Sequence, residues 1–466
     1  MEDGDLRELA EELAIDGRLP LNDLLPALAT WRRRERADSV VGDWRYRVTW
    51  VQLPEPASAA LTGSWLLAVP ESHTADPWLA ALVRALTEHG AHVVQIPVAV
   101  TDPALDRTTL AATLTAAVAG LEDTKVSGVL SVLSLDETPY PGVPTVPAGV
   151  AGTLFLLQAL GDAGIGAPLR ILTTGAVATG LGEPVTSAVL SEIWGLGRVV
   201  ALEHPDRWGG LIDLPAAWDD RIAHRFCGLL THVVEDQIAV RGSGILGRRL
   251  VRAPQARQSR TWTPGGTVLI TGGTGAIGGH VGRWLTGRGA ERIVLTSRSG
   301  AEAAGVPELA AALAGSGTDV VVASCDTARR SDVAGVLGRI AADGPPLSTV
   351  IHSAGVLDDG VLDRQSVPRL ATTLGAKAAG AAWLDELTRD ADLDAFVVFS
   401  SAAATFGGGG QGNYAAANAY LDGLVEKRRA AGLPGLSVAW GPWPAAACRR
   451  PLTPPGPGCA ATSGRS

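Results

Sequence analysis

Four polar side chains in the C-terminal half of the sequence are suited to proton transfer: Ser401, Tyr414, Asn418 and Lys377. Tyr414 and Asn418 are four residues apart in a predicted helix from Asn413 to about Arg429, so they share one face of that helix. A tyrosine, with a pKa of about 10, becomes a useful acid when a nearby ammonium group lowers that pKa. Only three lysines occur among the 39 Lys and Arg residues, which makes Lys377 the candidate ammonium. Taken singly, each of the four also fits a structural or surface role.

The residues around Ser401 indicate which elements would bring these groups together. Phe396–Ser401 is predicted to be a strand, and Ser401 lies at its C-terminal end, where open α/β sheets bind their ligands. A glycine-rich stretch, Gly407–Gly412, separates this strand from the predicted helix. Lys377 lies in an alanine-rich stretch that is also predicted to be helical.

A glycine-rich turn further upstream is predicted to bind a dinucleotide. The apolar strand Thr267–Thr271 runs directly into a Gly-x-Gly-x-x-Gly pattern made by Gly273, Gly275 and Gly278, and an amphipathic helix follows. Glycine lets backbone amides approach a pyrophosphate closely, and the helix N-terminus adds a partial positive charge. In a chain with 57 glycines the alternative is a structural turn, but the flanking strand and helix favour the dinucleotide site.

The ends of the next two predicted strands indicate which dinucleotide would bind. The strand Arg292–Ser297 is followed by Arg298, at the position where NAD-selective sites carry an acidic residue. An arginine accommodates a 2′-phosphate instead, so we predict NADPH. Asp326 ends the strand that begins at Asp319 and is a candidate acceptor for an adenine amine. A surface arginine and an unliganded loop carboxylate are the alternative interpretations.

Composition excludes several classes of protein. A length of 466 residues corresponds to about three units of roughly 150 residues, and a hydrophobic fraction of 46% excludes wholesale disorder. The sequence has no uninterrupted run of 18 apolar residues, so no transmembrane helix is expected. The acidic N-terminus lacks the pattern of a secretory signal. The four cysteines lie too far apart for a metal site or a disulfide framework, which favours a cytoplasmic location. A net charge of −9 disfavours nucleic-acid binding.

The chain contains two similar halves. From residue 44 onward, short apolar strands alternate with helical stretches, the pattern of βαβ units around a parallel sheet. Three predicted strands of the first half resemble three of the second: those beginning at Ser64, Ser127 and Leu169 match those beginning at Gly266, Ser348 and Phe396. We therefore predict an α/β fold with two tandem Rossmann-like subdomains and a boundary near residues 253–264. Chance similarity of strand composition is the alternative.

Two features of the N-terminal region lie outside this repeat. Residues 5–36 carry leucines at helical spacing but are too few to own a core, so they must pack on the rest of the chain or on a second copy of it. Residues 44–50 alternate large apolar side chains with Arg and Thr, which predicts a strand with one buried face.

Four motifs together resemble the ketoreductase domain of modular type I polyketide synthases, within the short-chain dehydrogenase/reductase superfamily. They are Thr271-Gly-Gly-Thr-Gly-Ala-Ile-Gly, His352-Ser-Ala-Gly-Val-Leu-Asp-Asp, Phe399-Ser-Ser-Ala-Ala and Gly410-Gln-Gly-Asn-Tyr-Ala-Ala-Ala-Asn-Ala-Tyr-Leu-Asp. The resemblance extends from about Trp44 to Trp443 and implies that the first subdomain is a truncated Rossmann unit without a cofactor. The superfamily has a lysine four residues after the tyrosine, whereas these ketoreductases have asparagine there and take the lysine from an upstream helix. Asn418 and Lys377 fit that exchange.

The resemblance implies a reaction and a role for each residue. NADPH would reduce the β-carbonyl of a β-ketoacyl chain bound to an acyl carrier protein, with Tyr414 protonating the developing alkoxide and Ser401 hydrogen-bonding the same oxygen. Lys377 would lower the pKa of Tyr414 and bind the nicotinamide ribose, and Asn418 would orient Lys377 or a relay water. No metal is expected. The implied cofactor contacts are Thr271, Gly273, Thr274, Gly275, Ile277, Gly278, Ser297, Arg298, Cys325, Asp326, Ser353, Ala354 and Gly355.

The resemblance also implies a stereochemical class. Leu357, Asp358 and Asp359 match the motif of B-type ketoreductases, which form the D-configured hydroxyl, and with Gln411 they would guide the substrate. A plain acidic loop is the alternative interpretation. Phe406 occupies the position of the A-type tryptophan, and Ala416 the position where epimerising B-type domains have proline. The expected enzyme is therefore B-type and does not epimerise an α-substituent.

The sequence thus predicts four segments: a helical dimerisation or linker element (1–43), a structural subdomain (44–255), a catalytic NADPH-binding subdomain (256–444) and an atypical, disordered tail (445–466). Residues 5–36 resemble the dimerisation element of such modules, so a homodimer is expected beside the carrier protein and neighbouring synthase domains. The Pro- and Gly-rich tail stands where the family has a lid helix and a last strand. The competing hypotheses are a scaffold module impaired by that loss and a short-chain reductase of a free small ketone.

Overall fold

The computed structural model describes residue 32 and residues 41–56, 60–121, 125–180, 183–232, 235–253 and 262–443. The chain divides into two compact units, one of Met1–Val51 with Arg248–Thr261 and the other of Gln52–Gly247 with Trp262–Ser466. Most of the predicted helical segment 5–36, the whole predicted tail 445–466 and most of the predicted boundary near 253–264 lie outside the described residues.

The smaller unit contains most of strand β1 (Tyr46–Leu53) beside the end of β10 (Gly244–Arg252). The strand predicted near residues 44–50 is therefore confirmed, but its predicted buried face is wrong. Trp44, Tyr46 and Val48 are 74%, 51% and 42% exposed. β1 ends the strand order and has a partner on one side only, so backbone pairing holds it without burying either face.

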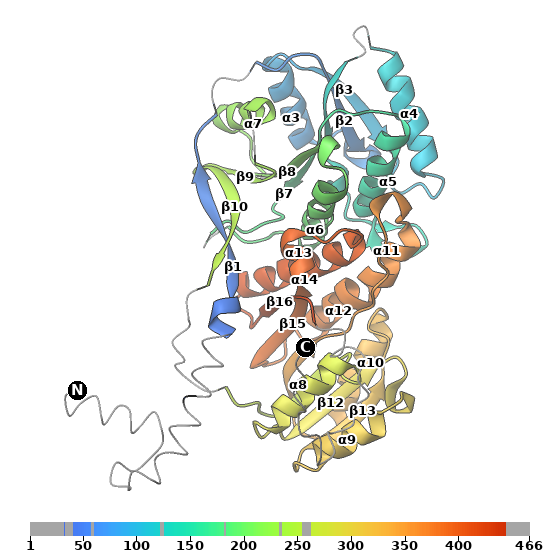
Figure 1. Cartoon of the computed structure of the whole chain (residues 1–466), viewed down its shortest axis with the longest axis vertical. Helices are drawn as coiled ribbons and strands as arrows, with labels where there is room; N and C mark the ends of the chain where they lie inside the picture. Colours follow the sequence, from blue (N-terminus) through green and yellow to red (C-terminus); the bar gives the residue numbers. More distant parts are fainter. Residues whose placement is uncertain are drawn as a thin grey trace, which may run out of the picture. The chain divides into compact units, whose positions relative to one another are not determined.

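The first half of the larger unit is built on a mainly parallel sheet with the order β10-β9-β8-β7-β4-β2-β3, in which only the β9–β10 pair is antiparallel. Figure 1 shows the strands and the helices that accompany them. The strands are β2 (Ser64–Pro70), β3 (His92–Val98), β4 (Val126–Ser131), β7 (Leu169–Thr174), β8 (Trp208–Leu214) and β9 (Gln237–Arg241), with a short β5 (Pro139–Tyr140) and β6 (Val143–Pro147) pair. The helices are α3 (Pro77–Glu88), α4 (Arg107–Ala119), α5 (Ala148–Asp162), α6 (Ala188–Glu203) and α7 (Asp220–His232).

The second half contains a fully parallel sheet of six described strands in the order β13-β12-β11-β14-β15-β16. The strands are β11 (Thr267–Thr271), β12 (Arg292–Ser297), β13 (Asp319–Ser324), β14 (Leu347–His352), β15 (Ala395–Ser401) and β16 (Leu436–Trp440). The helices are α8 (Ala276–Thr286), α9 (Val306–Ala314), α10 (Arg330–Ala342), α11 (Val367–Leu374), α12 (Gly380–Leu387), α13 (Ala402–Phe406) and α14 (Gly412–Ala430), with a π-helix, η6 (Gly375–Ala379), between α11 and α12. Short 3-10 turns complete the described elements: η1 (Glu71–His73), η2 (Leu133–Leu135), η3 (Pro205–Arg207), η4 (Gly300–Glu302) and η5 (Leu362–Arg364).

The two sheets confirm the predicted pair of tandem Rossmann-like subdomains. The order β3-β2-β4-β7-β8 in the first sheet is the order β12-β11-β14-β15-β16 in the second. Even an irregularity is repeated, because the register with the neighbouring strand shifts between Ser64 and Trp65 in β2 and between Thr267 and Val268 in β11. This shift matches Ser64 to Thr267, one position away from the predicted match to Gly266.

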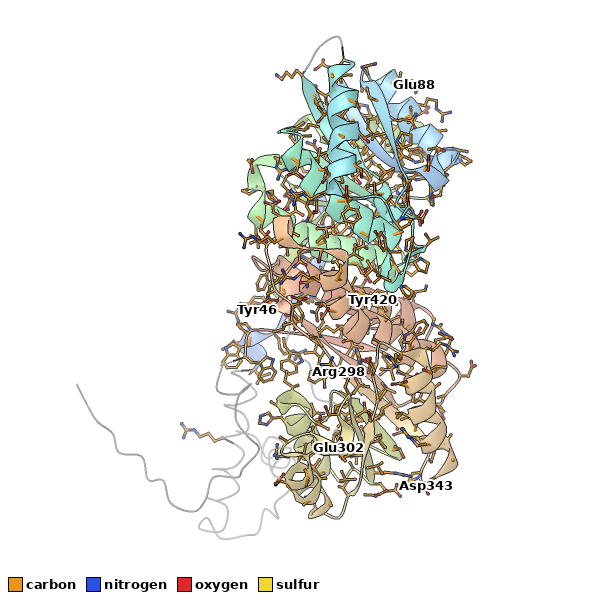
Figure 2. All side chains as sticks on the ribbon, turned by 90° about the vertical axis from the view of Figure 1, so that its right-hand side faces the viewer. Tyr46, Glu88, Arg298, Glu302, Asp343 and Tyr420 are labelled. Carbon is orange, nitrogen blue, oxygen red and sulfur yellow. The ribbon has the colours of Figure 1, made fainter. Side chains whose placement is uncertain are left out.

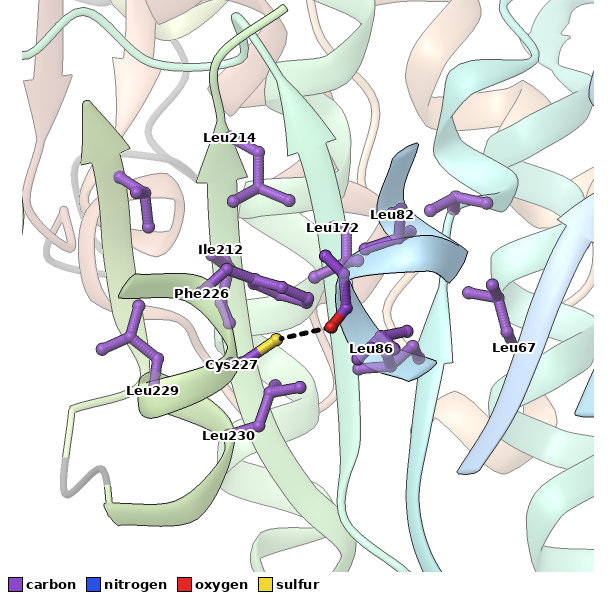
Figure 3. Close-up of a cluster of buried hydrophobic side chains, with 14 of the residues drawn as sticks. Leu67, Leu82, Leu86, Leu172, Ile212, Leu214, Phe226, Cys227, Leu229 and Leu230 are labelled. Atoms are coloured by element: carbon purple, nitrogen blue, oxygen red, sulfur yellow. Dashed lines mark hydrogen bonds between the residues drawn. The ribbon is translucent and has the colours of Figure 1, made fainter. Parts of the chain in front are cut away.

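An apolar cluster between α3, α7 and the first sheet holds these elements together (Figure 3). Its fully buried members include Leu82, Leu172 and Phe226. Cys227 also belongs to it, and its Sγ lies 3.6 Å from the carbonyl oxygen of Ala85. Burial raises the pKa of this thiol to about 12, so Cys227 packs as an apolar group and not as a nucleophile. No helix among the described residues has the length and apolar character needed to cross a bilayer.

Candidate active site

The turn between β11 and α8 is shaped by residues without side chains. Gly272 has a φ of 66°, and a Cβ there would lie 2.8 Å from the backbone of Ala354. A Cβ on Gly278 would lie 2.5 Å from the backbone of Gly272 and Gly273. Any side chain would therefore fill this cradle at the N-terminus of α8, which begins after Gly275. Bare backbone at a helix N-terminus suits the pyrophosphate of a dinucleotide.

Further residues of the predicted nucleotide site lie on this turn and on the adjacent loop after β14. Thr274 belongs to the turn and Ile277 to the first turn of α8. The Ser353 hydroxyl donates to the carbonyl oxygen of Thr271 at 2.8 Å, which joins the two loops. A Cβ on Gly355 would lie 2.7 Å from Cε of Lys377, so the lysine side chain runs directly over that glycine.

The predicted selectivity residues follow β12 and β13. Arg298 comes directly after β12, and its side chain is exposed (Figure 2). The Ser297 hydroxyl accepts from the amide of Gly300 at 3.1 Å, and Cys325 is buried at the end of β13. The predicted adenine acceptor Asp326 is engaged locally, because its carboxylate accepts from the amide of Ala328 at 3.2 Å ahead of α10.

The side chains of Ser401, Tyr414 and Lys377 converge at the C-terminal ends of β14 and β15. The Lys377 Nζ lies 5.4 Å from the centroid of the Tyr414 ring and donates to the carbonyl oxygen of Phe399 at 2.8 Å. Ser401 caps α13 by accepting from the amide of Ala403 at 3.2 Å, and its side chain lies near enough to Tyr414 to favour ionisation of the phenol. The structure thus brings together residues from a strand, a π-helix and a long helix, as the sequence predicts.

The pKa of Tyr414 differs from the expectation. Burial raises this pKa, and the neighbouring side chains of Ser401 and Asn418, which favour the ionised phenol, only partly offset that effect. The net pKa of Tyr414 thus lies above its ordinary value, and a lowering contribution from Lys377 stays a prediction. Burial also lowers the pKa of Lys377 to about 8. Desolvation, which disfavours the charged form of each group, is the largest cause of both shifts.

Asn418 is fully buried on α14, one turn after Tyr414. Its Nδ2 donates to the carbonyl oxygen of Tyr414 at 2.8 Å, while its Oδ1 has no hydrogen-bond partner among the described residues. A buried amide oxygen without a partner has room for one further donor, such as a water or a ligand hydroxyl. Among the described residues, Asn418 makes no hydrogen bond to Lys377, so its predicted role in orienting that side chain stays a prediction.

His352 is a residue that the sequence analysis quoted in a motif without giving it a role. It is fully buried, with Nδ1 2.7 Å from Oγ1 of Thr271 and Nε2 2.9 Å from the carbonyl oxygen of Lys377. Burial lowers the pKa of His352 to about 3, so the imidazole is neutral, with Nε2 donating and Nδ1 accepting. His352 therefore links the nucleotide strand to the π-helix that carries Lys377. The motif that begins at His352 marked this residue in the sequence. Its partners, Thr271 and Lys377, are too far away in the sequence to be predicted from it.

The loop Leu357–Asp359 lies beside the start of α14. Asp358 accepts from Nε of Arg369 at 2.9 Å, and its backbone oxygen accepts from Nδ2 of Asn413 at 2.8 Å. Asp359 accepts from Nε2 of Gln411 at 3.1 Å, while Leu357 is 62% exposed. The predicted substrate-guiding residues are thus tied to the residues just before Tyr414. Arg369 and Asn413 were not among the predicted site residues.

The first subdomain holds the helix that carries Tyr414. Helices α6 and α14 pack so closely that a Cβ on Gly195 would lie 2.2 Å from the carbonyl oxygen of Ala415. A Cβ on Gly423 would lie 2.3 Å from Oγ of Ser191. Small residues on both helices permit this approach and fix the position of α14.

The fold and this site define a class of protein: a dinucleotide-binding α/β fold with a Ser-Tyr-Lys constellation at the carboxyl edge of its parallel sheet. Profiles of known families agree with it. Residues 266–445 match the KR domain, residues 48–250 match the Rossmann fold domain of the polyketide synthase extender module SpnB, and residues 1–37 match the polyketide synthase dimerisation element domain.

Solved structures and curated sequences show the family. An A1-type ketoreductase is 46% identical with a TM-score of 0.81, over 86% of this chain and 83% of that one. A C2-type ketoreductase from a modular polyketide synthase is 42% identical with a TM-score of 0.78, over 86% and 85% of the two chains. Polyketide synthase GfsA of Streptomyces halstedii is 50% identical over 95% of this chain, which spans only 6% of that relative. The chain belongs to the ketoreductases of modular polyketide synthases.

Proposed function

We propose that this chain reduces the β-keto group of a thioester-bound β-ketoacyl chain, with NADPH as the reductant. The observation that carries the proposal is the convergence of Ser401, Tyr414 and Lys377 beside the glycine cradle. An acid, a second hydroxyl and a cation at the edge of a nucleotide crevice suit the conversion of a carbonyl into an alcohol.

The residues of the chain divide the work. Bound NADPH supplies the hydride, and the cradle of Gly272, Gly273 and Gly278 fits its pyrophosphate. Tyr414, whose pKa is raised by burial, holds its proton at neutral pH and gives it to the oxygen that becomes negatively charged. Ser401 donates to the same oxygen, and the Lys377 cation lowers the free energy of the tyrosinate left behind.

Arg298 supports NADPH over NADH. Arg298 directly follows β12, at the position where an NAD-selective site has a carboxylate that binds the ribose hydroxyls. Its guanidinium is exposed and able to pair with a 2′-phosphate. The other proposed cofactor contacts are Thr271, Thr274, Gly275, Ile277, Ser297, Cys325, Asp326, Ser353, Ala354 and Gly355. Of these, Asp326 accepts from the Ala328 amide through Oδ1, and its carboxylate keeps acceptor capacity for an adenine amine.

The loop Leu357–Asp359 supports a B-type reductase that forms the D-configured alcohol. A hydrogen bond joins Asp359 to Gln411, three residues before Tyr414, and this proximity supports contact of the loop with an entering acyl chain. Phe406 and Ala416 stand where the A-type tryptophan and the proline of epimerising B-type domains would be.

The partners are proposed on the same basis. The match of residues 1–37 to a dimerisation element supports a homodimer, and the thioester substrate requires a carrier protein with a phosphopantetheine arm. Neighbouring synthase domains in the cytoplasm would then deliver the acyl chain. We propose the subdomain limits 1–43, 44–255, 256–444 and 445–466 for this arrangement.

The test follows NADPH absorbance with a β-ketoacyl pantetheine thioester and, in parallel, with a free small ketone of the same length. We expect turnover of the thioester, a D-configured product and negligible reduction of the ketone. Equal reduction of both would favour a general short-chain reductase. Tight NADPH binding without turnover would favour a scaffold role and contradict the proposal.

A further inference from the structure

The last residue of helix α6 reaches from the cofactor-free subdomain into the catalytic one. One carboxylate oxygen of Glu203 accepts from the amide of Leu362 at 2.6 Å, and the other accepts from the amide of Gly410 at 2.7 Å. Leu362 begins the short η5 turn after the Leu357–Asp359 loop, and Gly410 belongs to the glycine-rich loop before α14. A single carboxylate therefore bonds two loops that are far apart in sequence.

These two loops are also bonded to each other. The amide of Gly360 donates to the carbonyl oxygen of Gly410 at 2.7 Å, and Gly360 and Gln411 form an isolated parallel bridge. The side chain of Gln411 then donates to Asp359 at 3.1 Å. Through these bonds Glu203 is connected to the proposed substrate-guiding residues and to the beginning of α14, the helix that carries Tyr414.

Other residues of the first subdomain contact only one of the two loops. Gln158 Nε2 donates to the carbonyl oxygens of Leu362 and Gln365 at 2.8 Å and 3.0 Å, and Arg107 donates to that of Asp363 at 3.0 Å. These bonds hold the η5 turn on the first subdomain. Among the described residues of the first subdomain, Glu203 is the group that hydrogen-bonds Gly410.

We propose that Glu203 is a positioning residue for ketoreduction: its carboxylate sets the spacing between the Leu357–Asp359 loop and the glycine-rich loop, and so the orientation in which the β-ketoacyl chain meets Tyr414. The inference rests on the proposed function and gives the cofactor-free subdomain a direct part in substrate placement. Short bonds from two amides to one anion are charge-assisted and hold a defined geometry.

The chemistry of the bonds indicates the right variant. A glutamine at position 203 keeps the size of the side chain, but its amide offers one acceptor oxygen and places an NH2 group against the second backbone donor. Glu203→Gln therefore loses one of the two bonds and introduces a conflict between donors. Asp206→Asn is the matched control, since Asp206 lies three residues further on, is exposed, and bonds neither loop.

The first measurement uses the full chain with NADPH and a β-ketoacyl pantetheine thioester. For Glu203→Gln we expect the KM of the thioester and the fraction of minor alcohol stereoisomer each to rise on the order of tenfold. The Kd of NADPH is expected to stay within about twofold, because Glu203 bonds Leu362 and Gly410 and not the glycine cradle. Asp206→Asn should match the wild type. An unchanged KM and product ratio in Glu203→Gln would overturn the inference.

The second measurement does not depend on turnover. Amide hydrogen exchange of the full chain should show lost protection in the peptides that contain Leu362 and Gly410 in Glu203→Gln, and normal protection elsewhere. Retained protection in both peptides overturns the inference. If the wild type reduces no thioester, the proposed function fails, while this exchange result still decides whether Glu203 holds the two loops.

Discussion

The Lys377 ammonium lies 5.4 Å from the centre of the Tyr414 ring, and both side chains are largely buried. Burial moves the two pKa values apart, since it raises that of Tyr414 and lowers that of Lys377 to about 8. At neutral pH the pair therefore consists of a protonated phenol beside a cation. This is the state required to give up a proton to an alkoxide and to stabilise the tyrosinate that remains.

The pH dependence of the reduction reports on Lys377. Because burial sets the pKa of Lys377 to about 8, the cation is present below that pH and is lost above it. We expect kcat/KM for the thioester to fall with an apparent pKa of about 8, approaching tenfold per pH unit beyond it. In Lys377→Arg the charge persists, so this fall should move to higher pH. Lys427→Arg is the control, and an unmoved fall in Lys377→Arg would contradict the assignment.

Arg298 is expected to determine the choice of cofactor. Arg298→Ala removes the proposed partner of the 2′-phosphate, so the KM for NADPH should rise about tenfold or more while the KM for NADH changes little. Arg221→Ala, at an exposed position in α7, should leave both values unchanged. Equal effects of Arg298→Ala on the two cofactors would show that Arg298 does not contact the 2′-phosphate.

The packing of α6 against α14 is expected to support both stability and activity. In Gly195→Ala the new methyl group would meet the carbonyl oxygen of Ala415 at 2.2 Å, so we expect a loss of about 1–3 kcal/mol in the free energy of unfolding and slower turnover. Gly335→Ala in α10 meets no atom within 4 Å and should be neutral or stabilising by up to about 1 kcal/mol. Urea unfolding of both variants measures the difference. Equal stability of the two would show that the helices separate easily.

Acid should destabilise the site through His352. Its pKa is lowered to about 3 by burial, below the ordinary value of 6.5, so the unfolded chain binds a proton that the folded chain rejects. This contribution to stability is present above pH 6.5 and declines as the pH falls toward 3. Between pH 7 and pH 5 we expect His352 to account for about 2 kcal/mol of lost unfolding free energy. Over this pH range, His352→Gln should lose about 2 kcal/mol less unfolding free energy than the wild type does. His280→Gln, at an exposed position, should lose as much as the wild type.

Local patterns predicted much of the fold and part of the site. The strand, glycine turn and helix from Thr267 to Thr286 are contiguous in sequence, and so is the order of Ser401 and Tyr414 around a glycine-rich loop. Their chemistry depends on neighbours a few residues away. The repetition of three strands in the two halves was predictable for the same reason, because each half carries its own alternation of strands and helices.

Features that depend on distant contacts were not predictable. The direction of the Tyr414 pKa shift depends on how deeply α14 is buried, and the roles of His352 and Glu203 depend on partners that other loops supply. The exposure of Tyr46 escaped prediction because alternation indicates a strand without saying what covers its apolar face. Asp326 satisfies a backbone amide of its own turn, which a strand-end position does not reveal.

The most direct test of the central claim compares two tyrosines on the same helix. Tyr414→Phe removes the proposed acid, and Tyr420→Phe removes a hydroxyl from a residue six positions along α14 that has no proposed role. With a saturating β-ketoacyl thioester, we predict that Tyr414→Phe lowers the rate of NADPH oxidation by about 10²- to 10⁴-fold with an unchanged Kd for NADPH, while Tyr420→Phe stays near the wild-type rate. A Tyr414→Phe enzyme that keeps the wild-type rate would contradict the account.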